Sequence, residues 1–94
     1  MAHVMIRHRV QDFERWRQVF EAAADFRRDG GEQRYEVFEI HDDPDHVVLL
    51  FEWDSMERAR AFLANPELSD AMDQAGVESP PEVWFLEQRT VGTL

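Results

Sequence analysis

Four side chains in this sequence carry the chemistry that a catalytic or binding site needs: His8, Trp53, Arg7 and Tyr35. His8 lies in the segment VMIRHRV, on a face that it shares with apolar residues, and could act as a general base near neutral pH. The alternative for His8 is a hydrogen-bonded structural histidine. Trp53 ends the apolar run VVLLFEW, where its indole could stack on an aromatic substrate or donate its N–H. The alternative for Trp53 is packing in the core alone.

Arg7 and Tyr35 are candidates for substrate binding. Arg7 could hold a carboxylate or an enolate, because a guanidinium makes strong charge-assisted hydrogen bonds. An ion pair at a dimer interface is the alternative. Tyr35 is the only tyrosine; it could hydrogen-bond a ligand, or it could lie at a sheet edge with its hydroxyl in water. We therefore predict His8 and Trp53 as catalytic residues and Arg7 and Tyr35 as binding residues.

Residues 41–46, HDDPDH, place two histidines and three aspartates across a tight turn. Zinc or nickel could bind such a group. The same segment is typical of a solvated turn whose histidines point apart. We therefore predict no metal site and keep metal binding by this turn as the alternative.

The residue types that are missing exclude several kinds of chemistry. The chain has no cysteine and no lysine, which excludes a thiol nucleophile, a disulfide, a Schiff-base lysine and a P-loop lysine. No serine lies in a G-x-S-x-G turn, the setting of an esterase nucleophile. Gly30-Gly31 lacks the further glycines of a phosphate-binding loop.

Charge and hydropathy argue against nucleic acids and membranes as partners. The formal net charge is −10, whereas binding to phosphates needs a basic surface. No apolar stretch reaches the roughly 20 residues of a membrane-spanning helix, and the cytoplasm is the expected compartment. The 94 residues suit one domain over 1–94, with a loose tail at 90–94.

Hydrophobic periodicity predicts the elements that must position these side chains. Alternation predicts strands at 3–10, 34–41, 46–53 and 82–88. Asp-Asp-Pro-Asp at 42–45 is a predicted turn.

Apolar residues at steps of three and four predict the helices. A long helix is expected over 13–28, capped by Asp12 and ended by Gly30-Gly31. The D-x-x-E spacing of Asp54 and Glu57 predicts a capping box for the next helix. Asn65-Pro66 is a typical start for a last helix over 66–75.

The order strand, helix, strand, strand, helix pair, strand is the split βαβ pattern. We therefore predict an α+β, ferredoxin-like βαββ(αα)β fold, in which a four-stranded antiparallel sheet carries its helices on one face. Residues 46–53 are apolar on both faces, and parity alone does not say which set meets the helices. Because one apolar face then lacks a cover, we expect a homodimer in which two sheets pack face to face.

Three segments resemble one known family: VMIRHRVQDFERWRQVF, VVLLFEWDSMERARAFLANPELSDAM and PEVWFLEQ. They look like the antibiotic biosynthesis monooxygenase (ABM-like) and cyclase-like proteins of the dimeric α/β-barrel superfamily. The resemblance covers nearly the whole chain. It implies a dimeric α/β barrel and, in quinone-forming members, oxidation of polycyclic phenols without any cofactor. Trp53 lies near the tryptophan that such members use.

The chain departs from the haem-degrading members of that superfamily. Those proteins use a histidine on the helix after the third strand, where this chain reads ARAFLAN with Phe62 near the matching position. They also use an asparagine on the first strand, whereas the only asparagine here is Asn65. Haem degradation is therefore not expected, and no cofactor is predicted.

Two functions fit the sequence. The first is a small cofactor-independent monooxygenase or cyclase acting on an aromatic or polyketide-like compound, with its pocket lined by Trp16, Phe20, Trp53 and Phe62. The second is a non-catalytic ligand-binding or stress-related homodimeric module with the same fold. Cavity size separates the two, because aromatic side chains that filled the space would leave no room for a substrate.

Overall fold

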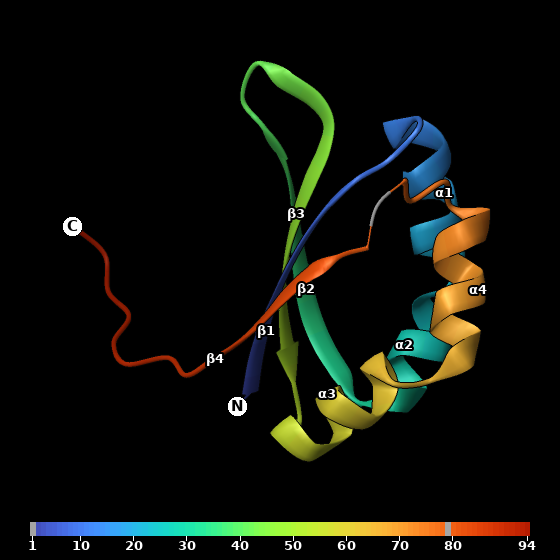
Figure 1. Cartoon of the computed structure of the whole chain (residues 1–94). Coiled ribbons are helices and arrows are strands. Elements are labelled where there is room, and N and C mark those ends of the chain that lie inside the picture. The colour runs from blue at the N-terminus through green and yellow to red at the C-terminus, as the bar shows by residue number, and fades with distance from the viewer. Residues whose placement is uncertain (1, 79) are drawn as a thin grey trace.

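The computed structural model describes residues 2–78 and 80–94. A four-stranded antiparallel sheet in the order β2-β3-β1-β4 carries four helices on one face (Figure 1). This confirms the predicted α+β, ferredoxin-like fold. The elements are β1 (Ala2–Arg9), α1 (Phe13–Ala22), α2 (Ala24–Gly30), β2 (Glu32–Ile40), β3 (Asp43–Trp53), α3 (Met56–Leu63), α4 (Pro66–Gln74) and β4 (Glu82–Leu86).

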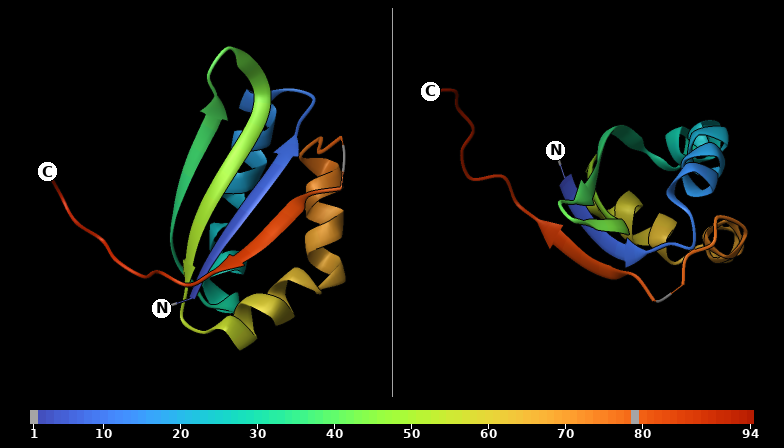
Figure 2. Two further views of the ribbon diagram at one scale, coloured as in Figure 1. Left: turned by 60° about the vertical axis from the view of Figure 1, so that its left-hand side comes forward. Right: turned by 90° about the horizontal axis from the view of Figure 1, so that it is seen from above.

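The two faces of the sheet have different surroundings (Figure 2). The face toward the helices, called the inner face, carries the buried residues Val47, Leu49, Phe51 and Trp53 of β3. Their partners on β1, Val4, Ile6 and His8, are buried as well. The structure thus decides which apolar set of β3 meets the helices.

The opposite, outer face has no helix over it (Figure 2). Strand pairing aligns Trp84, Met5 and Leu50 in one row across the sheet, and Val48 and Phe38 lie in the next row. Trp84 and Phe38 are exposed. The second apolar face expected from the sequence is therefore present and uncovered within the chain.

The predicted continuous helix over 13–28 is wrong at Ala23, where the chain breaks into α1 and α2. In an uninterrupted helix the carbonyl of Phe20 would accept from the N–H of Ala24. Here it accepts from Nη2 of Arg27 at 2.9 Å. The same carbonyl also accepts from the N–H of Ala23 at 3.3 Å, so the guanidinium adds a second bond to it, and Arg27 is turned toward the interior.

Two local predictions need correction. Ser55, not Asp54, caps α3, and its side chain accepts from the N–H of Arg58. Asp54 instead pairs with the Arg58 guanidinium, which also donates to the carbonyl of Asp29 at 2.7 Å.

The turn between β2 and β3 is shorter than predicted: Ile40 pairs directly with Asp43, so that only residues 41–42 connect the two strands. Asp42 adopts the left-handed conformation, φ 63°, that aspartate tolerates in turns.

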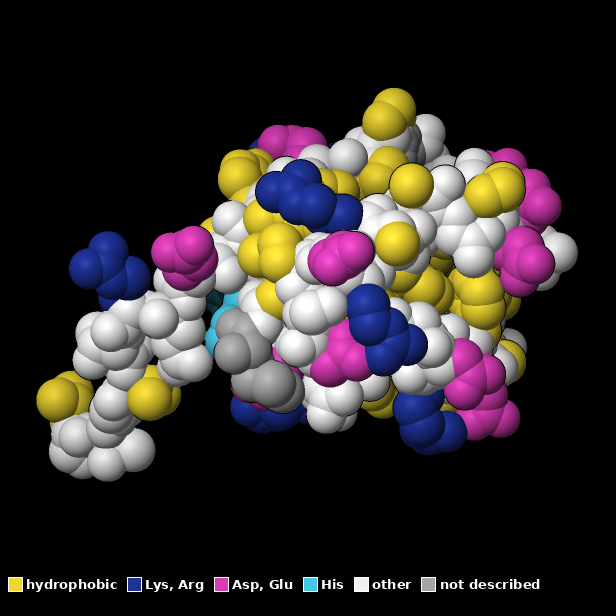
Figure 3. Space-filling model, turned by 90° about the horizontal axis from the view of Figure 1, so that it is seen from below, with side chains coloured by type: hydrophobic (Ala, Val, Ile, Leu, Met, Phe, Trp, Pro, Cys, Tyr) yellow, Lys and Arg dark blue, Asp and Glu magenta, His cyan; other side chains and the backbone are white. Residues whose placement is uncertain are grey.

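After β4 the chain leaves the sheet and has no helix or strand. This tail extends away from the body in all three whole-molecule views (Figures 1–3). Its apolar residues Val91 and Leu94 are exposed. Within residues 2–78 and 80–94, no helix has the length and apolar character needed to cross a membrane.

Candidate functional site

An apolar cavity of about 150 Å³ lies between the inner face of the sheet and the helices. Five of the residues proposed from the sequence, spread over four elements, lie on its wall: His8 (β1), Trp16 and Phe20 (α1), Trp53 (β3) and Phe62 (α3). Ile6, Leu49 and Phe51 continue the wall from the sheet. The spacing of three and four residues on the helices and of two on the strands brings these side chains together.

His8 is the polar group at one end of this cavity. Its side chain is 5% exposed, and neither Nδ1 nor Nε2 has a hydrogen-bond partner within the described residues. Burial, helped by the nearby charge of His46, lowers the pKa of His8 to about 4. The imidazole is therefore neutral at neutral pH, with one nitrogen able to donate and the other able to accept.

Stacked aromatic rings form the side wall. The Trp16 indole lies edge-on to His8, with ring centroids 5.9 Å apart, and stacks on Phe20 at 4.8 Å. Trp53 and Phe62 contact each other at 4.9 Å on the opposite part of the wall. Planar rings packed in this way offer faces and edges to a flat aromatic ligand.

A second polar group of the wall, Arg27 with Glu32, was not proposed from the sequence. The two form a buried ion pair. The guanidinium lies over the Phe20 ring, 3.6 Å from its centroid. Burial raises the pKa of Glu32, and the charge of Arg27 opposes that shift. Nε of Arg27 and Oε1 of Glu32 have no partner within the described residues.

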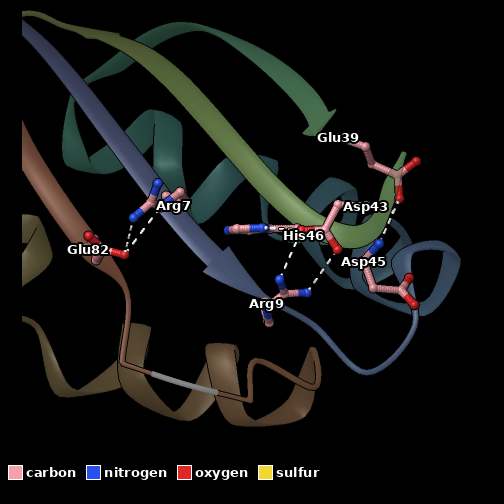
Figure 4. A network of polar contacts seen from close by, with 7 residues as sticks. All are labelled: Arg7, Arg9, Glu39, Asp43, Asp45, His46 and Glu82. Atoms are coloured by element: carbon pink, nitrogen blue, oxygen red, sulfur yellow. Dashed lines mark hydrogen bonds and ion pairs between the residues drawn. The ribbon is translucent and has the colours of Figure 1, made fainter. Parts of the chain in front are cut away.

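The structure does not bring Arg7 to this cavity. Arg7 alternates with His8 along β1 and therefore lies on the outer face. There it donates to Glu82 of β4, with Nη2 to Oε1 at 2.6 Å (Figure 4). Tyr35 lies at the margin of the cavity. It is 45% exposed, its ring is edge-on to that of Phe20 with the centroids 5.0 Å apart, and it lines a surface cleft beside β2 together with Arg27 and Glu32.

The histidine and aspartate side chains of the turn considered for metal binding contact one another and Arg9. His46 Nδ1 lies 2.9 Å from Oδ2 of Asp43, which also accepts from Arg9 (Figure 4). His41 lies near Asp42, at 3.4 Å. Across residues 2–78 and 80–94, no group of three or more histidine and carboxylate side chains is arranged to hold a metal ion.

With this geometry established, the chain can be compared with known proteins. A family model described as antibiotic biosynthesis monooxygenase matches residues 1–74, most of the chain. The chain belongs to this family. A search of curated proteins found no match.

Solved structures of this family share the fold. SnoaB, a cofactor-independent oxygenase from Streptomyces nogalater, superposes with a TM-score of 0.78 at 20% identity, covering 96% of this chain and 94% of that one. A monooxygenase from the gene ActVA-Orf6 of Streptomyces coelicolor, in complex with the ligand nanaomycin D, gives 0.71 at 17%, covering 99% and 91%. A putative antibiotic biosynthesis monooxygenase from Deinococcus radiodurans gives 0.71 at 20%, covering 100% and 98%.

The sequence did contain a signal for Arg27 and Glu32, the two polar wall residues that were not proposed from it. Arg27 follows Phe20 by seven residues, two helical turns, so a charged side chain stood on the apolar side of the predicted helix. Glu32 lies opposite Trp53 at the start of β2, two residues before the predicted strand began. Only the fold shows that these two side chains meet.

Proposed function

We propose that this protein is a cofactor-independent monooxygenase or cyclase that acts on an aromatic or polyketide-like compound. Family membership supports the reaction class. The observation that carries the proposal is His8, a buried imidazole with two unpartnered nitrogens on the wall of an apolar cavity. A polar group buried in this way ordinarily has a partner, and the hydroxyl of a bound phenol would supply one.

In the proposed reaction His8 takes a proton from the phenol or from the acidic carbon of its keto form. The resulting anion passes one electron to O2, and the two radicals combine to form a C–O bond, giving a peroxide anion that takes the proton back from His8. The hydroperoxide then loses water, with the hydrogen that remains on the same carbon, and leaves a C=O group, so that one oxygen atom enters the product and the other leaves as water. Because the pKa of His8 is about 4, the neutral base is available at neutral pH, and the substrate anion beside it would favour its protonation.

The cavity limits what can bind without movement. Its volume of about 150 Å³ is below the range of roughly 300–1,000 Å³ that is common for ligand sites. A cavity of about this size holds a single benzene ring. We therefore expect a compound with several fused rings to displace wall side chains as it binds, with Trp53 stacking on the rings remote from His8.

Oxygen consumption with a panel of anthrones tests this proposal. We expect the wild type to consume O2, His8→Ala to lower the rate by about 100-fold, the lower bound for loss of a general base, and Trp53→Phe to lower it less. His41→Ala, at an exposed turn position, is the control. Unchanged rates in both site variants would remove the assignment of His8 and Trp53. Ligand binding without any O2 consumption would leave the non-catalytic module.

We also propose that the protein is a homodimer that pairs the outer faces of two sheets. The apolar residues Val48 and Leu50 lie on the central strand β3 of that face, and Trp84 lies on the edge strand β4. The pairs Arg7–Glu82 and Arg34–Glu52 flank them. Such an apolar patch rimmed by charge is typical of an interface. Light scattering at micromolar concentration should give a dimer mass, and Val48→Asp should give a monomer; a monomeric wild type would contradict the proposal.

A further inference from the structure

The cavity has two polar positions, and only the one at His8 takes part in the proposed reaction. The other is the pair Arg27–Glu32, whose members are 5% and 9% exposed. Opposite partners on β3 place the two positions apart: His8 pairs with Val47, and Glu32 with Trp53. Six residues of strand separate these partners, but the side chains lie closer together: the contacts that run from His8 through Trp16 and Phe20 to Arg27 place the His8 ring and the guanidinium carbon at most about 14 Å apart. The apolar rings of Trp16 and Phe20 lie between them.

The Arg27 guanidinium is held in place from three sides. Nη1 donates to Glu32, Nη2 donates to the Phe20 carbonyl at 2.9 Å, and the planar group lies 3.6 Å from the centroid of the Phe20 ring. These contacts leave one donor, Nε–H of Arg27, and one acceptor, Oε1 of Glu32, buried and without a partner in the described part of the chain. Buried groups of this kind are uncommon unless something binds them.

The remaining donor and acceptor define what would fit. The two charges compensate each other within the pair, so an anionic group would be repelled by Glu32 as strongly as Arg27 attracts it. A hydroxyl group both accepts and donates, so it can accept from Nε–H of Arg27 or donate to Oε1 of Glu32. Arg27 and Glu32 also line the surface cleft beside β2 that contains Tyr35. The Arg27–Glu32 pair therefore lies where the cavity meets that cleft.

We propose that Arg27 and Glu32 bind a neutral hydroxyl group at the end of the aromatic ligand remote from His8. The protein would then prefer elongated aromatic compounds with a hydroxyl group at each end over those with only one. This inference takes the cavity and the aromatic ligand class from the proposed function, but it concerns affinity and does not depend on reaction with O2.

Calorimetric titration under nitrogen tests it with two pairs of probes: 2-naphthol against 2,6-dihydroxynaphthalene, and 4-hydroxybiphenyl against 4,4′-dihydroxybiphenyl. In the wild type we expect the second hydroxyl to improve Kd by about tenfold in at least one pair, the value of one good hydrogen bond. The double variant Arg27→Met/Glu32→Leu should bind the single-hydroxyl probes as the wild type does and lose the gain. Replacement of a buried ion pair by apolar residues is commonly tolerated.

The matched control is Arg7→Met/Glu82→Leu, which removes an ion pair from the outer face. It should keep the full gain from the second hydroxyl. No gain in the wild type, or a gain that survives in the Arg27/Glu32 variant, would overturn the inference. Because no step needs O2, loss of oxygenase activity with the gain intact would reject the proposed reaction and leave this binding position standing.

The affinity for an anionic ligand gives a second measurement, with a variant that replaces one oxygen atom of Glu32. The wild type should bind 6-hydroxy-2-naphthoate no better than 2-naphthol, because Glu32 compensates the charge of Arg27. Glu32→Gln removes that compensation and should bind the carboxylate about tenfold more tightly than the wild type does, as expected for a charge-assisted hydrogen bond. Equal affinities in the two proteins would contradict the assignment of this pair as the ligand-binding group.

Discussion

The two faces of the sheet treat polar side chains in opposite ways. On the outer face, polar and charged groups pair with one another: Arg7 with Glu82, Arg9 with Asp43, and His46 with the same Asp43 (Figure 4). On the inner face His8 has no partner, and the Arg27–Glu32 pair satisfies only part of its hydrogen-bonding capacity. These outer pairs are complete without a ligand, and Nδ1 of His3 is the outer-face side-chain atom that is buried without a partner among the described residues. The inner groups are incomplete at four atoms, two of His8 and one each of Arg27 and Glu32.

The physical setting explains why this difference matters. Exposed ion pairs contribute little to stability, because water screens the charges and solvates them equally well when they separate. An unpaired polar group in an apolar interior costs free energy that a bound ligand could recover. The inner face thus gives up stability at the places where a substrate would bind, at more atoms than the outer face, where Nδ1 of His3 is the corresponding case among the described residues. Four predictions test this contrast, from the largest expected effect to the smallest.

The two faces each carry a tryptophan, and their removal should differ most. Trp53 is 2% exposed in the inner core, so Trp53→Ala should lower the free energy of unfolding by about 3–5 kcal/mol. Trp84 is 38% exposed on the outer face, and Trp84→Ala should cost about 1 kcal/mol or less in protein diluted until it is monomeric. Urea unfolding over a range of protein concentrations measures both. Equal losses for the two variants in dilute protein would abolish the contrast.

The buried His8 should make stability depend on pH. Its pKa in the folded protein, about 4, is lower than the ordinary value near 6.5. Between these values the unfolded chain binds a proton that the folded protein does not, so stability falls as the pH falls from 6.5 to 4. The full loss is about 3 kcal/mol. Above pH 6.5 the group contributes no dependence.

His8→Leu isolates this effect, because other groups titrate in the same range. The difference in unfolding free energy between wild type and variant should change by about 3 kcal/mol between pH 7 and pH 4, in favour of the variant at low pH. His41→Leu removes a histidine from the exposed turn and serves as the control. A difference that stayed constant with pH would mean that His8 is solvated or paired in the folded protein.

Close packing of the cavity wall gives a smaller effect. A Cβ added at Gly30 would lie 2.5 Å from Cδ1 of Phe62, a wall residue that must then move. We expect Gly30→Ala to lower the free energy of unfolding by about 1–2 kcal/mol, overpacking outweighing the gain in helix propensity. Gly92→Ala, with nothing within 4 Å, should leave stability unchanged. A stabilised Gly30→Ala would show that the wall yields easily, which would favour binding of larger ligands.

The same contrast shows how far the sequence alone could lead. Alternation along residues 46–53 showed that both faces were apolar, and the helical spacing of Trp16 and Phe20 brought them to the wall with His8 and Trp53. Parity could not tell inner from outer, because that depends on which side the helices cross. The break at Ala23 was also out of reach. It is accompanied by the bond from Arg27 to the Phe20 carbonyl, a contact that exists only in the folded chain.

Arg7 provides the most demanding test of this separation, because sequence reasoning placed it beside the substrate. The sheet lies between its guanidinium and the cavity, and its contacts are Glu82 and the Trp84 ring, 5.7 Å from the guanidinium carbon. Arg7→Gln should therefore change the affinity for 2-naphthol by less than about twofold and the free energy of unfolding by less than about 1 kcal/mol. A tenfold loss of affinity would mean that the outer face contributes to ligand binding, either directly or through a second subunit, and that the two faces do not act separately.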